Sequence, residues 1–247
     1  MRRELSRQVR RTSLGQRCTL CYCSRLTQPC DKHTITHATS DPLDHLIAGN
    51  RRYVAHTTEK DPNVFVDLAK GQAPEILWIG CADSRVPETT VCHCKPGDIF
   101  VHRNIANTVH ANDLNSASVV EYAVAHLKVK KVVVCGHTKC GGAAAALGDA
   151  DLGGTLNTWL HPVRELRRKH MSELQRLPSD DARAARVAEL NVQQSIEVLK
   201  AHPAIRRAIS ERGLTLHGLI YDIGAGSLKI IDNAAGGKKV NGLWSPK

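Results

Sequence analysis

The sequence lacks the features that would place it in a membrane or in a repeat architecture. Among its 247 residues, no apolar stretch approaches the roughly eighteen residues that a membrane helix needs, and no secretory apolar region is visible. Internal repeats are absent, and low-complexity sequence is confined to the N-terminal segment. We therefore expect a soluble protein without membrane partners. Its length and its 42% hydrophobic content suit one globular domain with an extension.

Acidic residues are scarce in the N-terminal segment. Residues 1–40 carry eight Lys or Arg and only two acids, Glu4 and Asp31, and so supply +6 of the net charge of +10. An Arg-rich, Ser-bearing, acid-poor N-terminus is typical of mitochondrial transit peptides. We therefore expect a transit-peptide-like, disordered extension over residues 1–39, a single domain over residues 40–247 and a mitochondrial location, with the cytoplasm as the alternative.

The same segment holds cysteines and histidines that leave other interpretations open. They are Cys18, Cys21, Cys23, Cys30, His33 and His37. Besides a plain disordered tail, they allow a second zinc site or a basic arm that binds nucleic acid. No apolar run nearby would hold such a metal site in shape, so we expect neither that site nor a nucleic-acid partner.

Apolar β-branched runs alternate with helical patterns along the rest of the chain. The expected strands are residues 75–80, 98–102, 131–135, 215–222 and 227–231, with a hairpin loop at 224–226. Helices are expected from Asp41, over 116–127, from Gly141 and across most of 152–212, where the charged stretch 164–169 suits a solvated face. This succession predicts an α/β fold, with a mostly parallel central sheet flanked by helices.

Polar residues follow two of the expected strands at the points where they end. Cys81, Asp83 and Arg85 alternate after the first strand, so an extended backbone turns all three side chains to one side. His137 and Cys140 follow the third strand, in the expected turn before a helix. Ligand sites in parallel sheets form outside the carboxyl ends of strands, so we expect the two clusters to meet.

Two thiolates and one imidazole suit a tetrahedral Zn²⁺ site with three protein ligands, Cys81, His137 and Cys140, and one open position. An open position indicates catalysis, because a structural site is normally closed by a fourth Cys or His. The alternative is a buried cysteine, a turn histidine and a capping cysteine without metal. The odd number of cysteines, nine with three assigned to the metal, indicates a reducing compartment.

These motifs resemble the signature of the β-class carbonic anhydrases of fungal and bacterial type. Cys-x-Asp-x-Arg at 81–85 and His-x-x-Cys-Gly-Gly at 137–142 match it, and the resemblance continues through 97–107, 121–124 and 217–222. It implies the fold of that class with an N-terminal helical arm, one zinc per subunit, and reversible hydration of carbon dioxide to bicarbonate and a proton. It also implies a homodimer or homotetramer with sites at subunit boundaries, in which the helix from Asp41 packs across a partner.

The zinc and two neighbouring side chains together give an expected mechanism. Zinc lowers the pKa of a bound water and so creates the hydroxide that attacks carbon dioxide. Since two thiolates cancel the formal charge of the metal, we expect a rate that rises towards alkaline pH. Asp83 would accept a hydrogen bond from the hydroxide, and Arg85 would pair with that carboxylate and keep it ionised. The resemblance adds an inactive state in which Asp83 closes the site as a fourth ligand.

Two further sets of residues are assigned by the resemblance. An apolar slot for carbon dioxide would be formed by Phe100, Ile105 and Gly141, although the first two suit plain core positions equally well. A second, noncatalytic bicarbonate pocket, found in one subgroup, would use Trp78, Arg103 and Tyr221 beside the small Gly80. The alternative for these is a core tryptophan and an arginine in an interface ion pair.

Three other functions remain open on the sequence. The same zinc site would serve a hydrolase of carbonyl sulfide or carbon disulfide. A noncatalytic module that binds zinc or bicarbonate would keep the fold without the activity, although the intact Asp83 and Arg85 argue against it. A nucleic-acid-binding protein would depend on the cysteine-rich N-terminal segment.

Overall fold

The structure of the protein is a computed structural model that describes residues 41–232. It divides into two compact units, residues 1–55 and 56–247, and their boundary falls within the first helix, α1 (Pro42–Lys60). The predicted extension over 1–39, with its alternative zinc site, lies outside the described residues. The apolar residues Leu43, Leu46 and Ile47 of α1 are exposed.

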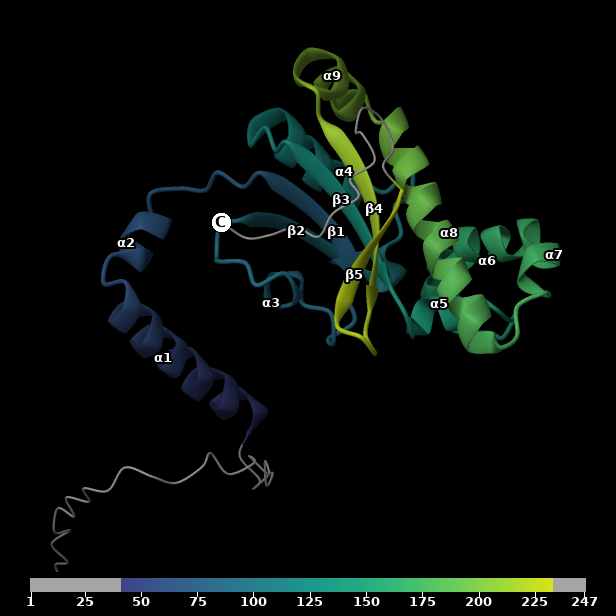
Figure 1. Cartoon of the computed structure of the whole chain (residues 1–247), viewed down its shortest axis with the longest axis horizontal. Coiled ribbons are helices and arrows are strands. Elements are labelled where there is room, and N and C mark those ends of the chain that lie inside the picture. The colour runs from purple at the N-terminus through teal and green to yellow at the C-terminus, as the bar shows by residue number, and fades with distance from the viewer. Residues whose placement is uncertain (1–40, 233–247) are drawn as a thin grey trace, which may run out of the picture. The chain divides into compact units, whose positions relative to one another are not determined.

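The second unit is built on a five-stranded sheet in the order β2-β1-β3-β4-β5, in which β5 alone runs antiparallel to its neighbour (Figure 1). The strands are β1 (Ile76–Cys81), β2 (Ile99–Asn104), β3 (Lys131–His137), β4 (Thr215–Asp222) and β5 (Ser227–Asp232). The predicted mostly parallel sheet is confirmed. Strands β1, β2 and β3 continue past their predicted ends, because these further residues pair with a neighbouring strand. His137 is therefore the last residue of β3, opposite Tyr221, and does not lie in the turn that follows.

Helices and short helical turns connect the strands. They are α2 (Val64–Leu68), α3 (Glu88–Val91), the 3-10 turn η1 (Ile105–Asn107), α4 (Leu114–Glu121), the π-helical turn η2 (Tyr122–His126), α5 (Gly141–Ala145), α6 (Gly154–Lys169), α7 (Met171–Leu174), α8 (Asp180–Ala201) and α9 (Pro203–Arg212). The helix expected over 116–127 is thus an α-helix that passes into a π turn. Within residues 41–232, no helix is long and apolar enough to span a membrane.

Local signals explain where several helices begin and end. Asp113 caps α4 by accepting hydrogen bonds from the backbone N–H groups of Asn115 and Ser116. Proline stands at the first position of α9, where its missing N–H costs nothing, and Gly213 ends that helix with a φ of +70°.

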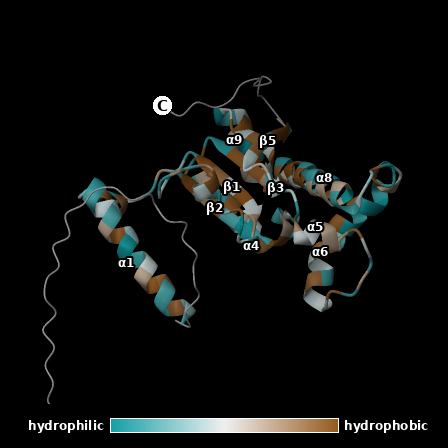
Figure 2. Cartoon of the chain, turned by 60° about the horizontal axis from the view of Figure 1, so that its bottom comes forward, coloured by the Kyte–Doolittle hydropathy of each residue, from teal (hydrophilic) through white to brown (hydrophobic). Residues whose placement is uncertain are grey.

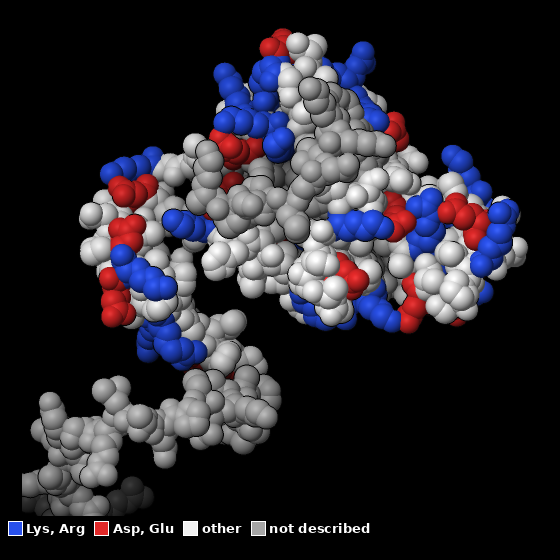
Figure 3. All heavy atoms as spheres, viewed as in Figure 1, with Lys and Arg blue, Asp and Glu red and all other residues white. Residues whose placement is uncertain are grey.

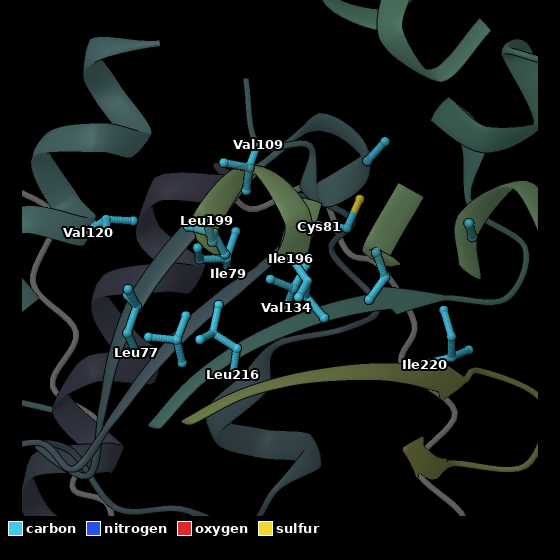
Figure 4. Packing of buried hydrophobic residues seen from close by; sticks show 14 of the residues in the cluster. Leu77, Ile79, Cys81, Val109, Val120, Val134, Ile196, Leu199, Leu216 and Ile220 are labelled. Carbon is cyan, nitrogen blue, oxygen red and sulfur yellow. The ribbon is translucent and has the colours of Figure 1, made fainter. Parts of the chain in front are cut away.

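The larger hydrophobic core lies between one face of the sheet and α8. Leu77 and Ile79 of β1 and Ile196 and Leu199 of α8 are almost completely buried and approach one another (Figure 4). Burying a side chain of this kind contributes about 1.5–3 kcal/mol. Alternation along β1 places Cys81 on the same face, so the first predicted zinc ligand stands at the end of this core.

The opposite face of the sheet carries a smaller cluster. Trp78, Val133 and Cys135 form it, and Tyr221 packs against it from β4. The brown strands in the middle of Figure 2 are hydrophobic, as is typical of parallel strands that are buried on both faces.

The solvated face expected at 164–169 is wrong for two of its arginines. Arg164 and Arg167 are buried, and their guanidinium groups donate hydrogen bonds to the backbone carbonyls of Ala150 and Leu147. These two arginines therefore stabilise the loop between α5 and α6. The exposed charges elsewhere are mixed: in Figure 3, basic and acidic side chains intersperse over the visible face.

Candidate metal centre

The structure brings the three predicted zinc ligands together at the carboxyl ends of β1 and β3. The Sγ atoms of Cys81 and Cys140 and a ring nitrogen of His137 all lie within 4.8 Å of one another, and all three residues are buried. Cys81 ends β1, His137 ends β3, and Cys140 directly precedes α5. Among the described residues, no other group of three His, Cys, Asp or Glu side chains is placed to hold a metal ion.

The hydrogen bonding of His137 identifies which nitrogen is available to a metal. Its Nδ1 lies 2.9 Å from the carbonyl oxygen of Thr138, and because a carbonyl only accepts, Nδ1 carries the proton and donates it. The other nitrogen, Nε2, is buried without a hydrogen-bond partner. A metal-bound histidine is typically oriented in this way, by a backbone carbonyl at the far nitrogen.

The thiols favour a metal as well. A hydrogen bond from Cys140 lowers the pKa of Cys81, whereas the pKa of Cys140 is raised, so Cys81 is the more acidic of the two thiols. A buried pair of sulfurs with one imidazole is a donor set that suits zinc. The residues present therefore fit the metal that the sequence predicted.

Asp83 is held by Arg85 beside this cluster. The Nε and Nη2 atoms of Arg85 donate to the two carboxylate oxygens at 2.9 and 2.7 Å, and the backbone N–H of Arg85 adds a third bond. These hydrogen bonds hold the pKa of Asp83 well below its usual range. Arg85 is itself tied to the carbonyl of Lys139, one residue before Cys140. One carboxylate oxygen of Asp83 lies 3.9 Å from Nε2 of His137, so the carboxylate borders the metal centre while paired with arginine.

The predicted slot residue Ile105 borders the centre in the η1 turn. A side chain added at Gly142, two residues after Cys140, would stand 2.9 Å from Cβ of Ala106 and 3.4 Å from Cγ2 of Ile105. The turn thus lies directly against the first turn of α5. Gly141 has no neighbour within 4 Å of its added Cβ and faces open space.

Phe100 is not brought to the centre within one chain. It pairs with Leu77 on the neighbouring strand and lies against the ring of Tyr122, with 5.7 Å between the ring centroids. It lies four positions before Asn104, the last residue of β2, which is about 13 Å of extended strand. Its assignment to the slot stays a prediction.

The residues of the predicted bicarbonate pocket lie on the other face of the sheet. The indole nitrogen of Trp78 is 2.6 Å from the position of a Cβ at Gly80, so only glycine allows this ring position. Arg103, the neighbour of Gly80 on β2, donates to the carbonyls of Cys81 and Asp83 at 2.8 and 2.6 Å. Tyr221 stands opposite His137 on β4. The assigned arginine is therefore bonded to the loop that carries the Asp83–Arg85 pair.

Sequence reasoning missed three polar residues around these sites. Glu88 is buried, with a carboxylate oxygen 3.8 Å from Nε of Arg103. Asn191 donates to the carbonyl of Ala106, and Trp159 donates to that of Ile105. A signal existed for Asn191, because it falls on the buried stripe of α8 and a buried amide needs a partner.

Comparisons with known proteins agree with this geometry. The sequence profile described as "Carbonic anhydrase" matches residues 76–228. A carbonic anhydrase of Emericella nidulans is 42% identical over 205 residues, which are 83% of this chain and 90% of that protein.

Solved structures extend the likeness to the backbone. One of two tetrameric β-carbonic anhydrases of Sordaria macrospora is 51% identical, with a TM-score of 0.76 over 76% of this chain and 96% of that one. A Coccomyxa β-carbonic anhydrase, solved with acetazolamide, is 38% identical, with a TM-score of 0.73 over 78% of this chain and 87% of that one. By sequence, fold and site, the chain belongs to the β-class carbonic anhydrases, a family of carbonate dehydratases.

Proposed function

We propose that the protein reversibly hydrates carbon dioxide to bicarbonate and a proton, using one zinc ion per subunit held by Cys81, His137 and Cys140. Two observations carry this proposal: a ring nitrogen of His137 and the sulfurs of Cys81 and Cys140 lie within 4.8 Å of one another, and Nε2 of His137 is buried without a hydrogen-bond partner. Zinc bound there would lower the pKa of a coordinated water and so supply the nucleophile near neutral pH.

Asp83 and Arg85 would orient that nucleophile. An ionised carboxylate only accepts hydrogen bonds, so Asp83 would take one from the attacking oxygen and leave its lone pair directed at the carbon of the substrate. Arg85 holds both carboxylate oxygens and keeps Asp83 ionised over the working pH range. If Asp83 released Arg85, its oxygen would have a short path to the metal, which supports the inactive, four-ligand state as a second form.

The slot for carbon dioxide would lie between the η1 turn and the start of α5, with Ile105 and Gly141 on its walls. Carbon dioxide is small and uncharged, so an apolar wall suits it. Phe100 would contribute only across a subunit boundary, because it lies far along β2 from the centre of its own chain.

An oligomer is supported by the exposed apolar side chains of α1 and by the tetrameric relatives of Sordaria macrospora. The Leu46→Glu/Ile47→Glu variant should give a smaller species in light scattering, whereas Asn50→Glu on the same helix should keep the wild-type mass. Equal masses for all three proteins would remove α1 from the interface.

The bicarbonate pocket is supported by the bonds of Arg103 to the carbonyls of Cys81 and Asp83. An anion that drew the guanidinium away would loosen the loop on which Asp83 stands, and so couple the two sites. Bicarbonate inhibition that survives Trp78→Phe and Tyr221→Phe unchanged would exclude this pocket.

The decisive experiment measures zinc stoichiometry together with stopped-flow hydration of carbon dioxide across pH. We expect one zinc per chain and a rate that rises towards alkaline pH. Carbonyl sulfide is measured in parallel, since sulfide release without hydration would indicate the hydrolase. Zinc-loaded protein that does neither would be a binding module.

Mitochondrial import rests on the Arg-rich, acid-poor composition of residues 1–39. A fluorescent protein carrying this segment should accumulate in mitochondria. A diffuse cytoplasmic signal would contradict the proposal.

A further inference from the structure

The η1 turn beside the metal centre has a strained backbone. Ala106 and Asn107 are consecutive non-glycine residues with positive φ values, +61° and +47°. Left-handed backbone is unfavourable for a side-chain-bearing residue, and alanine has no polar atom with which to compensate locally. Such a conformation persists only where the surrounding structure imposes it.

Asn104 and Ser195 hold the residues that follow the strained pair, since they accept hydrogen bonds from the backbone N–H groups of Thr108 and Val109. Two other side chains, on α6 and α8, hold the peptides of the turn itself. The indole nitrogen of Trp159, on α6, donates to the carbonyl of Ile105 at 2.9 Å. The side-chain amide of Asn191, on α8, donates to the carbonyl of Ala106 at 2.7 Å, in a buried position. Two consecutive peptide carbonyls are thus held by two distant helices.

The turn also lies against the start of α5, the helix that directly follows Cys140. Ala106 and Ile105 lie against Gly142, which follows Cys140 by two residues. The position of Ile105 relative to the zinc ligands therefore depends on the orientation of the two peptide groups that Trp159 and Asn191 hold. If either peptide rotated, Ile105 would move and a carbonyl oxygen would be free to face a site that must accept an apolar molecule.

We propose that Trp159 and Asn191 are positioning residues, which set the shape of the carbon dioxide slot by clamping the η1 turn. The inference rests on the proposed function for its substrate. Each residue would act through the backbone of the turn, to which it donates its hydrogen bond.

The test uses two variants that remove a donor and keep most of the volume, Trp159→Phe and Asn191→Leu, in the zinc-loaded full chain. Two controls match them. Asn157→Ala removes an α6 side chain that bonds to the backbone N–H of Leu152 and not to the turn. Val187→Ala opens a cavity in the buried face of α8, one turn before Asn191, and so lowers stability without touching the turn.

Three quantities are measured: kcat/KM for hydration across pH, the zinc content, and hydrogen exchange at residues 106–109. We expect kcat/KM to fall roughly tenfold in both test variants, because a small misplacement beside the reacting atoms is costly. Zinc content and the pH midpoint should stay unchanged, since the metal ligands and Asp83 are not altered. Exchange should rise in 106–109, while both controls keep kcat/KM within twofold of the wild type.

The proposal is overturned if the test variants lower kcat/KM no more than Val187→Ala does, or if exchange at 106–109 does not rise. If the zinc-loaded wild type itself fails to hydrate carbon dioxide, the proposed function falls. The exchange measurement then decides by itself whether these two residues clamp the turn.

Discussion

Replacing Gly142 by alanine tests how firmly the η1 turn is seated on α5. The added Cβ would stand 2.9 Å from Cβ of Ala106, 3.4 Å from Ile105 and 3.6 Å from Leu160. Favourable carbon contacts begin near 3.5 Å, so the turn or the helix must move by several tenths of an ångström. The hydrogen bonds from Trp159 and Asn191 resist that movement.

The expected size of the effect follows from two opposing contributions. Overpacking of this kind costs about 1–3 kcal/mol. Alanine in place of glycine at a helical position with an ordinary φ returns about 0.5–1 kcal/mol. The free energy of unfolding should therefore fall by up to about 2.5 kcal/mol. Since a chain of this size loses about 2–4 °C per kcal/mol, Tm should fall by up to about 10 °C.

Gly141→Ala is the matched control, because the neighbouring glycine has nothing within 4 Å of its added Cβ. This variant should be as stable as the wild type or slightly more stable. Urea unfolding of the three proteins at one fixed free zinc concentration gives the comparison, since metal binding itself adds stability. Equal unfolding midpoints for the two alanine variants would refute the close packing of the turn on α5.

Three other changes have defined outcomes. Cys81→Ser should abolish stoichiometric zinc in atomic absorption, together with the rise in Tm on adding zinc, whereas Cys94→Ser, outside the metal group, should keep both. The hydrogen bonds from Arg85 depress the pKa of Asp83, so this pairing stabilises the fold above the unfolded pKa, and that stability is lost as pH falls through the folded pKa. In the zinc-free protein, Arg85→Leu should therefore raise the titration midpoint of Asp83 towards about 3.9 in carboxyl NMR, and an unmoved midpoint would be inconsistent with the pair. Gly80→Ala should lower the free energy of unfolding by about 1–3 kcal/mol, since its Cβ would meet the indole nitrogen of Trp78 at 2.6 Å; wild-type stability in chemical denaturation would count against that packing.

Local patterns in the sequence were enough to predict the sheet and the metal centre. Apolar alternation and flanking glycines located each strand to within two residues, and β4 (Thr215–Asp222) was predicted with its observed bounds. The sequence also predicted that three ligands, Cys81, His137 and Cys140, would lie close together. The reason is that parallel strands end at a common edge of the sheet, which is a property of the fold class. Asp83 and Arg85 lie two residues apart, so their pairing is also a local matter.

Contacts between distant segments were decided only by the tertiary structure. Trp159 and Asn191 bond to carbonyls 54 and 85 residues earlier in the chain, and no periodicity in α6 or α8 encodes those partners. The burial of Arg164 and Arg167 likewise depends on loop carbonyls that a helical charge pattern does not reveal. The amino-acid sequence thus determined which side chains form the candidate metal group, because residue type and strand ends are local properties. Packing of separate helices determined the shape of the wall beside it, because the strained backbone of Ala106 and Asn107 exists only where α6 and α8 hold it.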